Sequence, residues 1–424
     1  MADFTGTTSL LEQRQGGLFR FILGELKPKG RILTPFNLIS IPVILLGLVL
    51  IALRFAFGLG MATNLSQDFP WGIWIGFDVM TGVALAGGAY VLTFLVYILG
   101  IEKYRPIVRA TILNGLLAYM FYAGCLLIDC GRPWNAFNPF IGNSFGVSSI
   151  MFLIAWHFML YMVACLVEFA PTIAEWLGKE RIRKLLSAMT LGAVIIGITL
   201  STLHQSGLGA LFLMAKGKLH PLWYTEFLPI LFFVSSIFAG LSMVVFEGSI
   251  SHKIFSNRLG PEQRSSHDGI VRGLAKICAG TMFVYLAMVA LVFIHNQSWT
   301  YIGTPMGQWW LVEIIGFVLI PMMLFVRGYR HRSTLLMRIA SAMALIGIIL
   351  NRLNVSVIAF KWDAPVHYIP SWIEIEITLA IIFIEIWIFR WVVNRMPVLN
   401  NLSQPASNPN RQSGANNVAA KESV

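Results

Sequence analysis

The chain alternates long apolar runs with short polar segments, and ten of the runs are long enough to form membrane-spanning helices. A bilayer core of about 30 Å needs about 20 apolar residues per helix. Gly207 and Gly209 either end the fifth helix near His204 or lie inside it. The pattern predicts an all-α polytopic membrane protein with helices at residues 37–60, 71–100, 109–130, 147–170, 187–213, 224–248, 269–294, 307–327, 335–353 and 372–392.

The two ends of the chain differ from this pattern. Residues 1–36 are polar and basic, and the apolar run that follows is long enough to span and has no small-residue cleavage site after it. We therefore expect a retained first helix and no cleavable signal peptide. From residue 396 the composition becomes rich in Asn, Ser, Gln and Pro, which predicts a flexible tail outside the membrane, at 396–424.

The basic residues predict the orientation. If the N-terminus is cytoplasmic, 25 of the 31 Lys and Arg residues fall in cytoplasmic regions and 6 fall on the other side. The bias alternates at every loop, as expected for a protein whose cytoplasmic loops collect positive charge. Ten helices with both termini cytoplasmic are therefore predicted.

The composition agrees with this class. Of the 424 residues, 57% are hydrophobic and only 12% are charged, whereas soluble domains carry about 25% charged residues. Soluble multidomain, disordered and nucleic-acid-binding proteins are therefore excluded, and the net charge of +11 reflects the loop bias. Four cysteines without a CxxC pair exclude a disulfide scaffold, and we expect most of them to pack in apolar surroundings.

Five ionisable residues on four consecutive helices lie toward the outer side of the predicted bundle. Ionisable side chains at membrane depth are costly, so each is a candidate functional residue. Asp78 lies about 10 Å and His157 about 15 Å below the outer surface, at a rise of 1.5 Å per residue. The other three are Asp129 and Arg132 at the end of the third helix and His204 in the fifth. Together they predict a pocket with an acid, a base, an Arg–Asp pair and an aromatic roof.

Structural roles compete with this interpretation. A salt bridge to Asp129 that pins the loop accounts equally well for Arg132, and a hydrogen bond to a backbone carbonyl is the simpler account of His157. Asp78 has no structural task that Asn would not perform at lower cost, and His204 is flanked by Gln205 and Ser206. A ligand therefore explains Asp78 and His204 better than structure does.

A second set of ionisable residues lies elsewhere in the helices. Glu168 and Glu247 fall at the inner ends of the fourth and sixth helices, where they are candidates for a proton relay. Snorkelling of helix-end side chains is the simpler account of both. The remaining members of the set are Glu313, Arg352 with Asn351 and Asn354, and Glu385.

Three kinds of function would use such a pocket. A transporter would have broken helices around a midplane site, but Gly82, Gly87 and Gly88 fit helix packing as readily as an unwound segment. A di-haem cytochrome needs two histidine pairs at matching depth, and only His157 and His204 qualify, which allows one haem at most. A quinone site needs hydrogen-bond partners for two carbonyl oxygens and a route for two protons, which His204 and Asp78 supply.

Several segments resemble the NrfD-like family of polysulfide reductase membrane subunits. They look most like its ten-helix branch, the HybB-type membrane subunit of periplasmic nickel–iron hydrogenases and related complexes. The resemblance covers about residues 30 to 395. Its motifs are PWGIWIGFDVMTGVALAGG, IDCGRPWN, STLHQSGLGALF, HPLWYTEFLPILFF, NRLNVSV and YIPSWIEIEITLAII.

The resemblance implies two four-helix bundles flanked by the first and last helices. The predicted organisation is a cytoplasmic segment at 1–36, a flanking helix at 37–70, a first bundle with the quinone site at 71–213, a second bundle at 224–353, a last helix at 372–392 and the cytoplasmic tail at 396–424.

The family's site residues match Asp78, Asp129, Arg132 and His204. Cys130 departs from the family's spacing in the turn after Asp129, and the family match does not extend to His157. The resemblance implies that Asp78 and His204 act in catalysis and that Asp129, Arg132 and Gln205 line the quinone site. His157 is added to that lining because of its predicted depth in the fourth helix.

The expected function is a haem-free quinone oxidoreductase subunit in the bacterial inner membrane, inactive on its own. It would bind menaquinone or ubiquinone and no metal. Its expected partners are a periplasmic ferredoxin-like iron–sulfur subunit and either hydrogenase large and small subunits or a multihaem cytochrome c. A mono-haem cytochrome b and a proton- or ion-conducting module without redox chemistry remain alternatives.

Overall fold

The computed structural model describes residues 18–27, 33–138, 148–254 and 261–399, in which all regular elements are helical. A single β-bridge joins Leu219 with Phe360. The chain is a multi-pass membrane protein, since nine helical stretches of these described ranges are long and apolar enough to cross a bilayer. They are Pro35–Phe57, Trp74–Ile98, Glu102–Asp129, Ile150–Trp176, Glu180–Ala215, Leu228–Ile254, Ser266–His295, Pro305–His331 and Thr334–Ile358.

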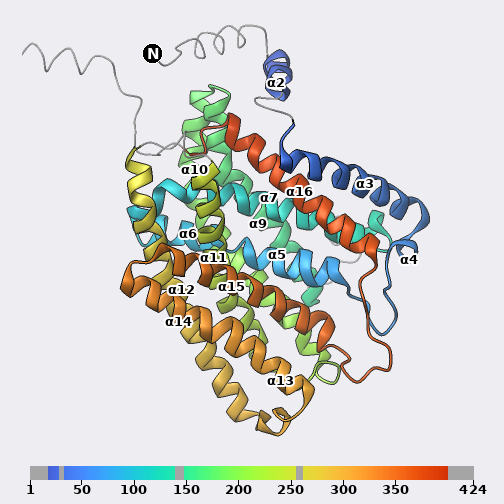
Figure 1. Ribbon diagram of the computed structural model, residues 1–424. Helices are drawn as coiled ribbons and strands as arrows, with labels where there is room; N and C mark the ends of the chain where they lie inside the picture. The colour runs from blue at the N-terminus through green and yellow to red at the C-terminus, as the bar shows by residue number, and fades with distance from the viewer. Residues whose placement is uncertain (1–17, 28–32, 139–147, 255–260, 400–424) are drawn as a thin grey trace, which may run out of the picture.

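The tenth predicted helix is present as α16 (Trp372–Arg395), which is not one of these nine stretches. It packs along α3 (Pro35–Phe57), and the two lie side by side in Figure 1. The side chain of Thr34 caps the start of α3, and Ser371 and Glu374 form a reciprocal capping box at the start of α16. The crossing of the bilayer by α16, and with it the count of ten spans, stays a prediction.

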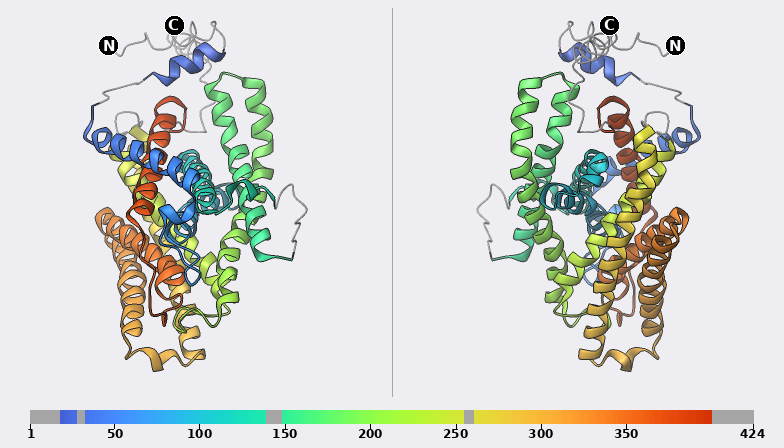
Figure 2. Two further views of the ribbon diagram at one scale, coloured as in Figure 1. Left: turned by 90° about the vertical axis from the view of Figure 1, so that its right-hand side faces the viewer. Right: turned by 90° about the vertical axis from the view of Figure 1, so that its left-hand side faces the viewer.

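Eight of the nine stretches follow α3 in the chain, and we describe them in chain order as two groups of four (Figures 1 and 2). The predicted division into two four-helix bundles stays a prediction. The first group begins with one interrupted helix, and α7 lies centrally in it. Its members are η1 (Trp74–Val79), α5 (Met80–Leu85), α6 (Gly88–Thr93) and η2 (Phe94–Ile98), followed by α7 (Arg105–Asp129), α9 (Ile150–Trp176) and α10 (Glu180–Leu211).

The second group lies on the opposite side of α7 from the α9–α10 hairpin (Figure 2). Its members are α11 (Leu228–Ile254), α12 (Pro261–His295), the stretch of α13 (Pro305–Leu311), η8 (Val312–Leu319) and α14 (Ile320–His331), and the stretch of α15 (Thr334–Leu353) and η9 (Asn354–Ile358).

The two groups contact each other along α11, which packs against α10, α6 and α5. One close crossing is that of α6 and α11. A Cβ atom on Gly88 would lie 2.7 Å from the carbonyl oxygen of Gly240, and one on Gly240 would overlap the backbone of Gly88. Only glycine at both positions allows the backbones to approach this closely. The glycines of the second predicted helix therefore serve packing: Gly88 lies at this crossing, and Gly82 lies under the ring of Tyr122.

Four described stretches are π-helical: η1, η2, η8 and η9. Asp78 lies in η1, Glu313 lies in η8, and Asn354 begins η9. A π-helical turn inserts one extra residue and shifts the faces of a helix, which is why such turns are frequent at functional sites. Three of the buried polar side chains singled out in the sequence therefore occur where the helix is locally rewound.

The structure decides between the two alternatives for the fifth predicted span. The helix α10 continues past His204 through Gly207 and Gly209 to Leu211, so both glycines lie inside it. Gly209 lies against the backbone of Leu228, which leaves no room for a side chain. His204 is therefore held in a continuous helix.

The two ends of the helical assembly have different character. At one end, which we call the basic end, the connections after α9 and α14 carry Lys179 and Arg332, and Arg395 at the end of α16 lies 3.5 Å from Glu25. The short helix α2 (Leu18–Leu26) lies here within the segment predicted as cytoplasmic. The remainder of that segment and most of the predicted tail lie outside the described residues.

At the opposite end, three loops pack together into a cap. Phe69 and Trp71 contact Phe360, and Trp71 also contacts the ring of Phe212. The β-bridge is supported by a backbone hydrogen bond from His220 to Ala359 at 3.0 Å. These loops come from the first, fifth and ninth connections of the chain and close the ends of both groups of helices.

Candidate functional site

His204 lies at the centre of a buried cluster between α7, α9 and α10. The ring of His204 is 1% exposed, and its centroid lies 5.2 Å from that of Phe158 and 5.9 Å from that of Tyr119. Ser201 and Gln205 lie one turn before His204 and directly after it on α10, and both are fully buried. We refer to Tyr119, Phe158, Ser201, His204 and Gln205 as the His204 cluster.

The polar atoms of the His204 cluster are not saturated by the protein. The Tyr119 hydroxyl, the Ser201 hydroxyl, both ring nitrogens of His204 and Oε1 of Gln205 are buried without a hydrogen-bond partner in the described chain. The hydroxyls of Tyr119 and Ser201 interact, as do the His204 ring and the Ile154 carbonyl, but outside hydrogen-bond geometry. Buried polar groups are nearly always paired in native proteins, so this cluster has capacity for water or a ligand.

Gln205 connects the His204 cluster to the helix that carries Asp78. Its Nε2 donates a hydrogen bond of 2.8 Å to the carbonyl of Val83 on α5. Val83 lies five residues after Asp78 in the same interrupted helix. This hydrogen bond therefore holds α10 against the helix of Asp78, and Oε1 of Gln205 has no hydrogen-bond partner in the described chain.

Asp78 is 2% exposed and belongs to a different set of contacts. Its carboxylate accepts a 2.8 Å hydrogen bond from Thr378 of α16 and a second from the thiol of Cys125 on α7. The indole of Trp74, one helical turn earlier, donates to the carbonyl of Glu374. Asp78 thus faces α16, whereas His204 faces α9, and α7 contacts both groups.

His157 lies beside His204 but nearer the surface of the bundle. Its side chain is partly buried, Nδ1 has no hydrogen-bond partner in the described chain, and its charge acts on His204. The neighbouring positions Leu153 and Leu160 of α9 are exposed on the outside of the assembly. His157 therefore lies between the His204 cluster and the surface that faces lipid.

The structure does not bring Arg132 to Asp129. Arg132 is exposed after the end of α7, and no acidic side chain of the described residues lies within 4.0 Å of its guanidinium. Arg54 of α3 takes that position: it donates to the carbonyls of Ile128 and Cys130, each at 2.5 Å, and its charge acts on Asp129. The chain turns outward at Gly131, which separates Arg132 from the buried end of α7.

The two carboxyl groups considered for a proton relay lie in different places. Glu168 of α9 is 8% exposed and lies against Gly197 of α10, in a column that continues through Cys165 and Tyr161. Glu247 of α11 accepts a 2.8 Å hydrogen bond from Asn114 of α7. Both side chains point into the helix assembly instead of extending toward the membrane surface, which argues against simple snorkelling.

A second buried polar cluster, the Glu313 network, lies between α11, α15 and η8. The carboxylate of Glu313 accepts hydrogen bonds from Trp223 at 2.8 Å, Asn351 at 2.7 Å and Asn354 at 2.5 Å. The guanidinium of Arg352 donates to Asn351 and Ser235 and lies 3.7 Å over the ring of Phe232. We define the network as Trp223, Ser235, Glu313, Asn351, Arg352 and Asn354.

Several of these residues were not predicted from the sequence. Tyr119, Ser201, Thr378 and Cys125 are uncharged, so the search for ionisable groups at membrane depth did not include them as site residues. Thr378 follows Glu374 by one helical turn, a spacing that places both on one face of α16. The described residues contain no group of three or more His, Cys, Asp or Glu side chains able to hold a metal ion.

A family model described as "Polysulphide reductase, NrfD" matches residues 61–360. The match includes all of both groups of helices. It therefore covers Asp78, the His204 cluster and the Glu313 network.

Three relatives cover most of the chain. A protein of Nitratidesulfovibrio vulgaris, named only "Protein", is 41% identical over 87% of this chain and 95% of its own length. The "Probable Ni/Fe-hydrogenase 2 b-type cytochrome subunit" of Escherichia coli strain K12 is 30% identical over 91% of this chain and 98% of its own. A protein of Mesobacillus selenatarsenatis named as a subunit of selenate reductase is 21% identical over 84% of this chain and 92% of its own.

Proposed function

This chain belongs to the NrfD family, and we propose that it is the membrane subunit of a respiratory redox complex that exchanges electrons with the quinone pool. It is a multi-pass protein of the bacterial inner membrane. Two relatives are named as subunits, one of a hydrogenase and one of a selenate reductase. The two names are explained if membrane subunits of this family serve complexes with different redox partners.

The His204 cluster is the observation that carries the proposal. It combines apolar and aromatic walls with unpaired donors and acceptors on Tyr119, Ser201, His204 and Gln205. A quinone head group is a flat apolar ring with two carbonyl oxygens that accept hydrogen bonds. Sites for such molecules are mostly apolar with a few well-placed polar groups, which is the composition found here.

The residues then take separate roles. His204 hydrogen-bonds one head-group oxygen, and Asp78 exchanges protons with the site from the other side of α7. Gln205 orients α10 against the helix of Asp78, and His157 lies on the approach from lipid. Asp129 and Arg132, with Arg54 holding the end of α7, shape the mouth of the site.

The overall reaction balances with an external electron carrier. Reduction of one quinone to quinol consumes two electrons and two protons, and quinol oxidation releases the same numbers. The described residues hold no group of side chains suited to a metal ion. We therefore propose an iron–sulfur protein as the electron partner, docked at the end opposite the basic end, with hydrogenase subunits or a multihaem cytochrome beyond it.

A mono-haem cytochrome is the second candidate, because one relative is named a b-type cytochrome subunit. In this chain the axial ligands would be His157 and His204. The His204 ring is packed edge-on against Phe158 and tilted against Tyr119. A haem plane would have to displace one of these rings, so the residues fit a small head group better than a porphyrin.

A visible spectrum separates the two candidates. The purified complex is measured oxidised and dithionite-reduced, this subunit is separated from its partners, and haem and quinone are extracted and quantified. We expect bound menaquinone or ubiquinone and no b-type haem band on this chain. A haem band on the isolated subunit would assign His157 and His204 as iron ligands and overturn the haem-free proposal.

Two substitutions test the site itself. Asp78→Asn and His204→Ala should each lower quinone-linked electron transfer by about 100-fold or more, because general acid–base groups contribute 10²–10⁴-fold to rates. Asp363→Asn and His295→Ala, both exposed, serve as matched controls. Normal turnover of the Asp78 and His204 variants in assembled complex would refute the site assignment.

A further inference from the structure

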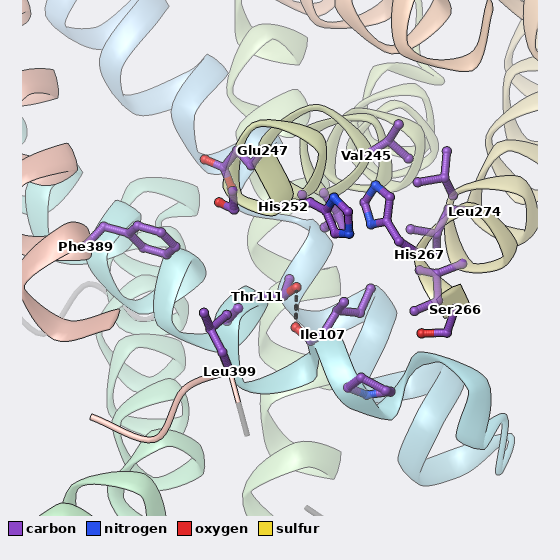
Figure 3. A pocket seen from close by; sticks show the side chains of 17 residues that line it. Ile107, Thr111, Val245, Glu247, His252, Ser266, His267, Leu274, Phe389 and Leu399 are labelled. Atoms are coloured by element: carbon purple, nitrogen blue, oxygen red, sulfur yellow. Dashed lines mark hydrogen bonds between the residues drawn. The ribbon is translucent and has the colours of Figure 1, made fainter. Parts of the chain in front are cut away.

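A cavity of about 110 Å³ lies at the basic end, between α7, α11 and α12. Figure 3 shows Glu247 on one wall and the imidazole rings of His252 and His267 side by side, with centroids 4.3 Å apart. The Nε2 atoms of both histidines are buried without a hydrogen-bond partner in the described chain. A cavity of this size holds several water molecules of roughly 30 Å³ each, and these would pair with the open nitrogens.

A series of carboxyl groups leads from this cavity into the membrane. The charge of Asp78 acts on Glu385 of α16, and the charge of Glu385 acts on Glu247. Tyr122 of α7 lies within electrostatic reach of all three carboxyl groups. The thiol of Cys125 bonds Asp78 and is also near Glu385. We call Asp78, Glu385 and Glu247 the carboxyl series.

The carboxyl series covers about half of the bilayer. Along α7 its partners run from Asn114, which bonds Glu247, to Cys125, which bonds Asp78. Eleven residues of helix correspond to about 16 Å at 1.5 Å per residue, against a hydrocarbon core of about 30 Å. Thr111, one turn before Asn114, already lines the cavity. The series therefore extends along α7 from the basic end to the depth of Asp78.

We propose that Asp78 exchanges protons with the basic side of the membrane through this cavity and the side chains of Glu247 and Glu385. The proposal rests on the quinone function proposed above and names the source of its protons. Each quinone reduced takes two electrons from the iron–sulfur partner and two protons through this route. The carboxyl groups are protonated and deprotonated in turn and are unchanged at the end.

The surroundings of the carboxyl series favour proton transfer over a fixed ion pair. The groups that act on its members are each other, Tyr122, Cys125, Thr378 and Asn114, none of which is cationic. Basic residues enter at the cavity, where the charges of Arg338 and His252, and the opposite charge of Asp268, act on His267. A carboxyl group without a cationic partner in the membrane is costly as a fixed charge and is typical of proton pathways.

The α9 column offers a competing route through Glu168. Between Glu168 and His204 it contains Cys165, Tyr161 and Tyr119, and no further carboxyl group. The carboxyl series instead reaches Asp78, the acid of the proposed site. We therefore assign proton exchange to the α7–α11–α16 interface and use Glu168→Gln to test the alternative.

The test uses the complete complex in vesicles with a pH indicator on the basic side of the membrane subunit. Turnover is driven by the complex's electron donor with a short-chain quinone. Glu385→Gln and Glu247→Gln should each lower quinone-linked turnover and the pH change on that side by about tenfold or more. Reduction of the iron–sulfur partner by the donor should be unaffected, and Glu385→Asp should recover part of the rate.

A matched control is available on the same helix. Glu376→Gln changes a carboxyl group nine residues before Glu385, on the face of α16 whose backbone lies against Gly47 of α3, and it should leave both readouts unchanged. Co-purification of the partner subunits verifies that each variant assembles. If Glu385→Gln fails to assemble, Glu247→Gln, which keeps a side chain able to bond Asn114, decides the outcome.

The outcomes separate the two proposals. Wild-type complex that reduces its iron–sulfur partner but never turns over quinone would refute the proposed function. Quinone turnover that persists at the wild-type rate in both Glu385→Gln and Glu247→Gln would overturn the route alone. Loss of basic-side proton exchange in Glu168→Gln, with Glu385→Gln normal, would transfer the route to the α9 column.

Discussion

The His204 cluster and the Glu313 network are both buried polar groups in an apolar helix assembly, yet they are satisfied to different degrees. Glu313 accepts three hydrogen bonds, and Arg352 uses two of its nitrogens in bonds to Asn351, Ser235 and the Phe232 carbonyl. In the His204 cluster, five buried polar atoms lack a partner in the described chain. In the Glu313 network, Nε of Arg352 is the one buried polar atom without a hydrogen-bond partner in the described chain.

The difference indicates different uses of polarity. A buried network of opposite charges in which nearly every donor and acceptor is bonded is stabilised by its own partners and fixes how helices pack. A cluster with spare donors and acceptors is incomplete until something else enters. Charge alone therefore does not mark a binding site in this protein. The more highly charged network, which lines a cavity of about 40 Å³, is almost fully hydrogen-bonded, and the neutral cluster keeps unpaired donors and acceptors.

The largest effect should come from breaking the Glu313 network. Arg352→Leu leaves Glu313 buried without the guanidinium charge nearby, and removal of one partner from a buried pair costs about 3–5 kcal/mol. We expect poor accumulation of the subunit and a much lower unfolding temperature of the complex. Adding Glu313→Gln to Arg352→Leu should recover part of the loss, and a double variant no better than the single one would contradict this account.

Serine substitutions compare the two regions directly. Ser235 accepts a 2.7 Å hydrogen bond from Arg352, so Ser235→Ala leaves a buried donor unpaired at a cost of about 1–3 kcal/mol. Ser201→Ala removes a buried hydroxyl that has no hydrogen-bond partner in the described chain, so it should lower stability clearly less than Ser235→Ala does. The unfolding temperatures of both variants test this difference. An equal decrease in the two variants would contradict the proposed difference between the two regions.

A smaller effect, on activity instead of stability, is expected from Tyr119→Phe. The substitution keeps the ring contacts to Phe158 and His204 and removes only the unpaired hydroxyl. We expect about tenfold slower quinone-linked electron transfer, equivalent to about 1.4 kcal/mol, with an unchanged unfolding temperature. Tyr285→Phe, beside the Glu313 network, is the control and should leave turnover intact.

The smallest effect concerns the cap that closes both regions. Burial lowers the pKa of His220 below its usual value, and its Nδ1 accepts a hydrogen bond from the Leu222 amide at 3.2 Å. Because the pKa of His220 is lower in the folded protein than in the unfolded chain, burial of the neutral imidazole contributes its full stability above about pH 6.5. That contribution is lost as the pH falls toward the folded pKa. The hydrogen-exchange protection factors of residues 218–224, which allow for the slower intrinsic exchange at low pH, should fall on acidification, and less so in His220→Asn.

Much of the fold follows from the sequence, whereas much of the site does not. The apolar runs predicted nine spans that the described helices match, and the tenth run forms the α16 helix. The resemblance to the NrfD-like family is confirmed by the family match. The roles assigned to Asp78, His204 and the residues around them stay predictions, although the structure adds neighbours that no local pattern revealed.

Two particular residues show why those neighbours escaped prediction. Asp78 is bonded by Thr378, which is 300 residues away in the chain. The arginine beside Asp129 is Arg54 and not Arg132, although Arg132 is only three residues from Asp129. Proximity in sequence suggested the second pair, and the outward turn at Gly131 prevents it.

The sequence by itself determined which segments enter the membrane, and it predicts which ends are basic, because the length of an apolar run and the charge of a loop are properties of one segment. Only the tertiary structure decided which polar groups satisfy one another, since a hydrogen bond in the membrane depends on the faces that two helices turn together. Those faces are set by close crossings such as Gly88 against Gly240 and by the π-helical turn that carries Asp78. The difference between the almost fully hydrogen-bonded Glu313 network and the His204 cluster with its unpaired polar atoms therefore arises only when the helices pack.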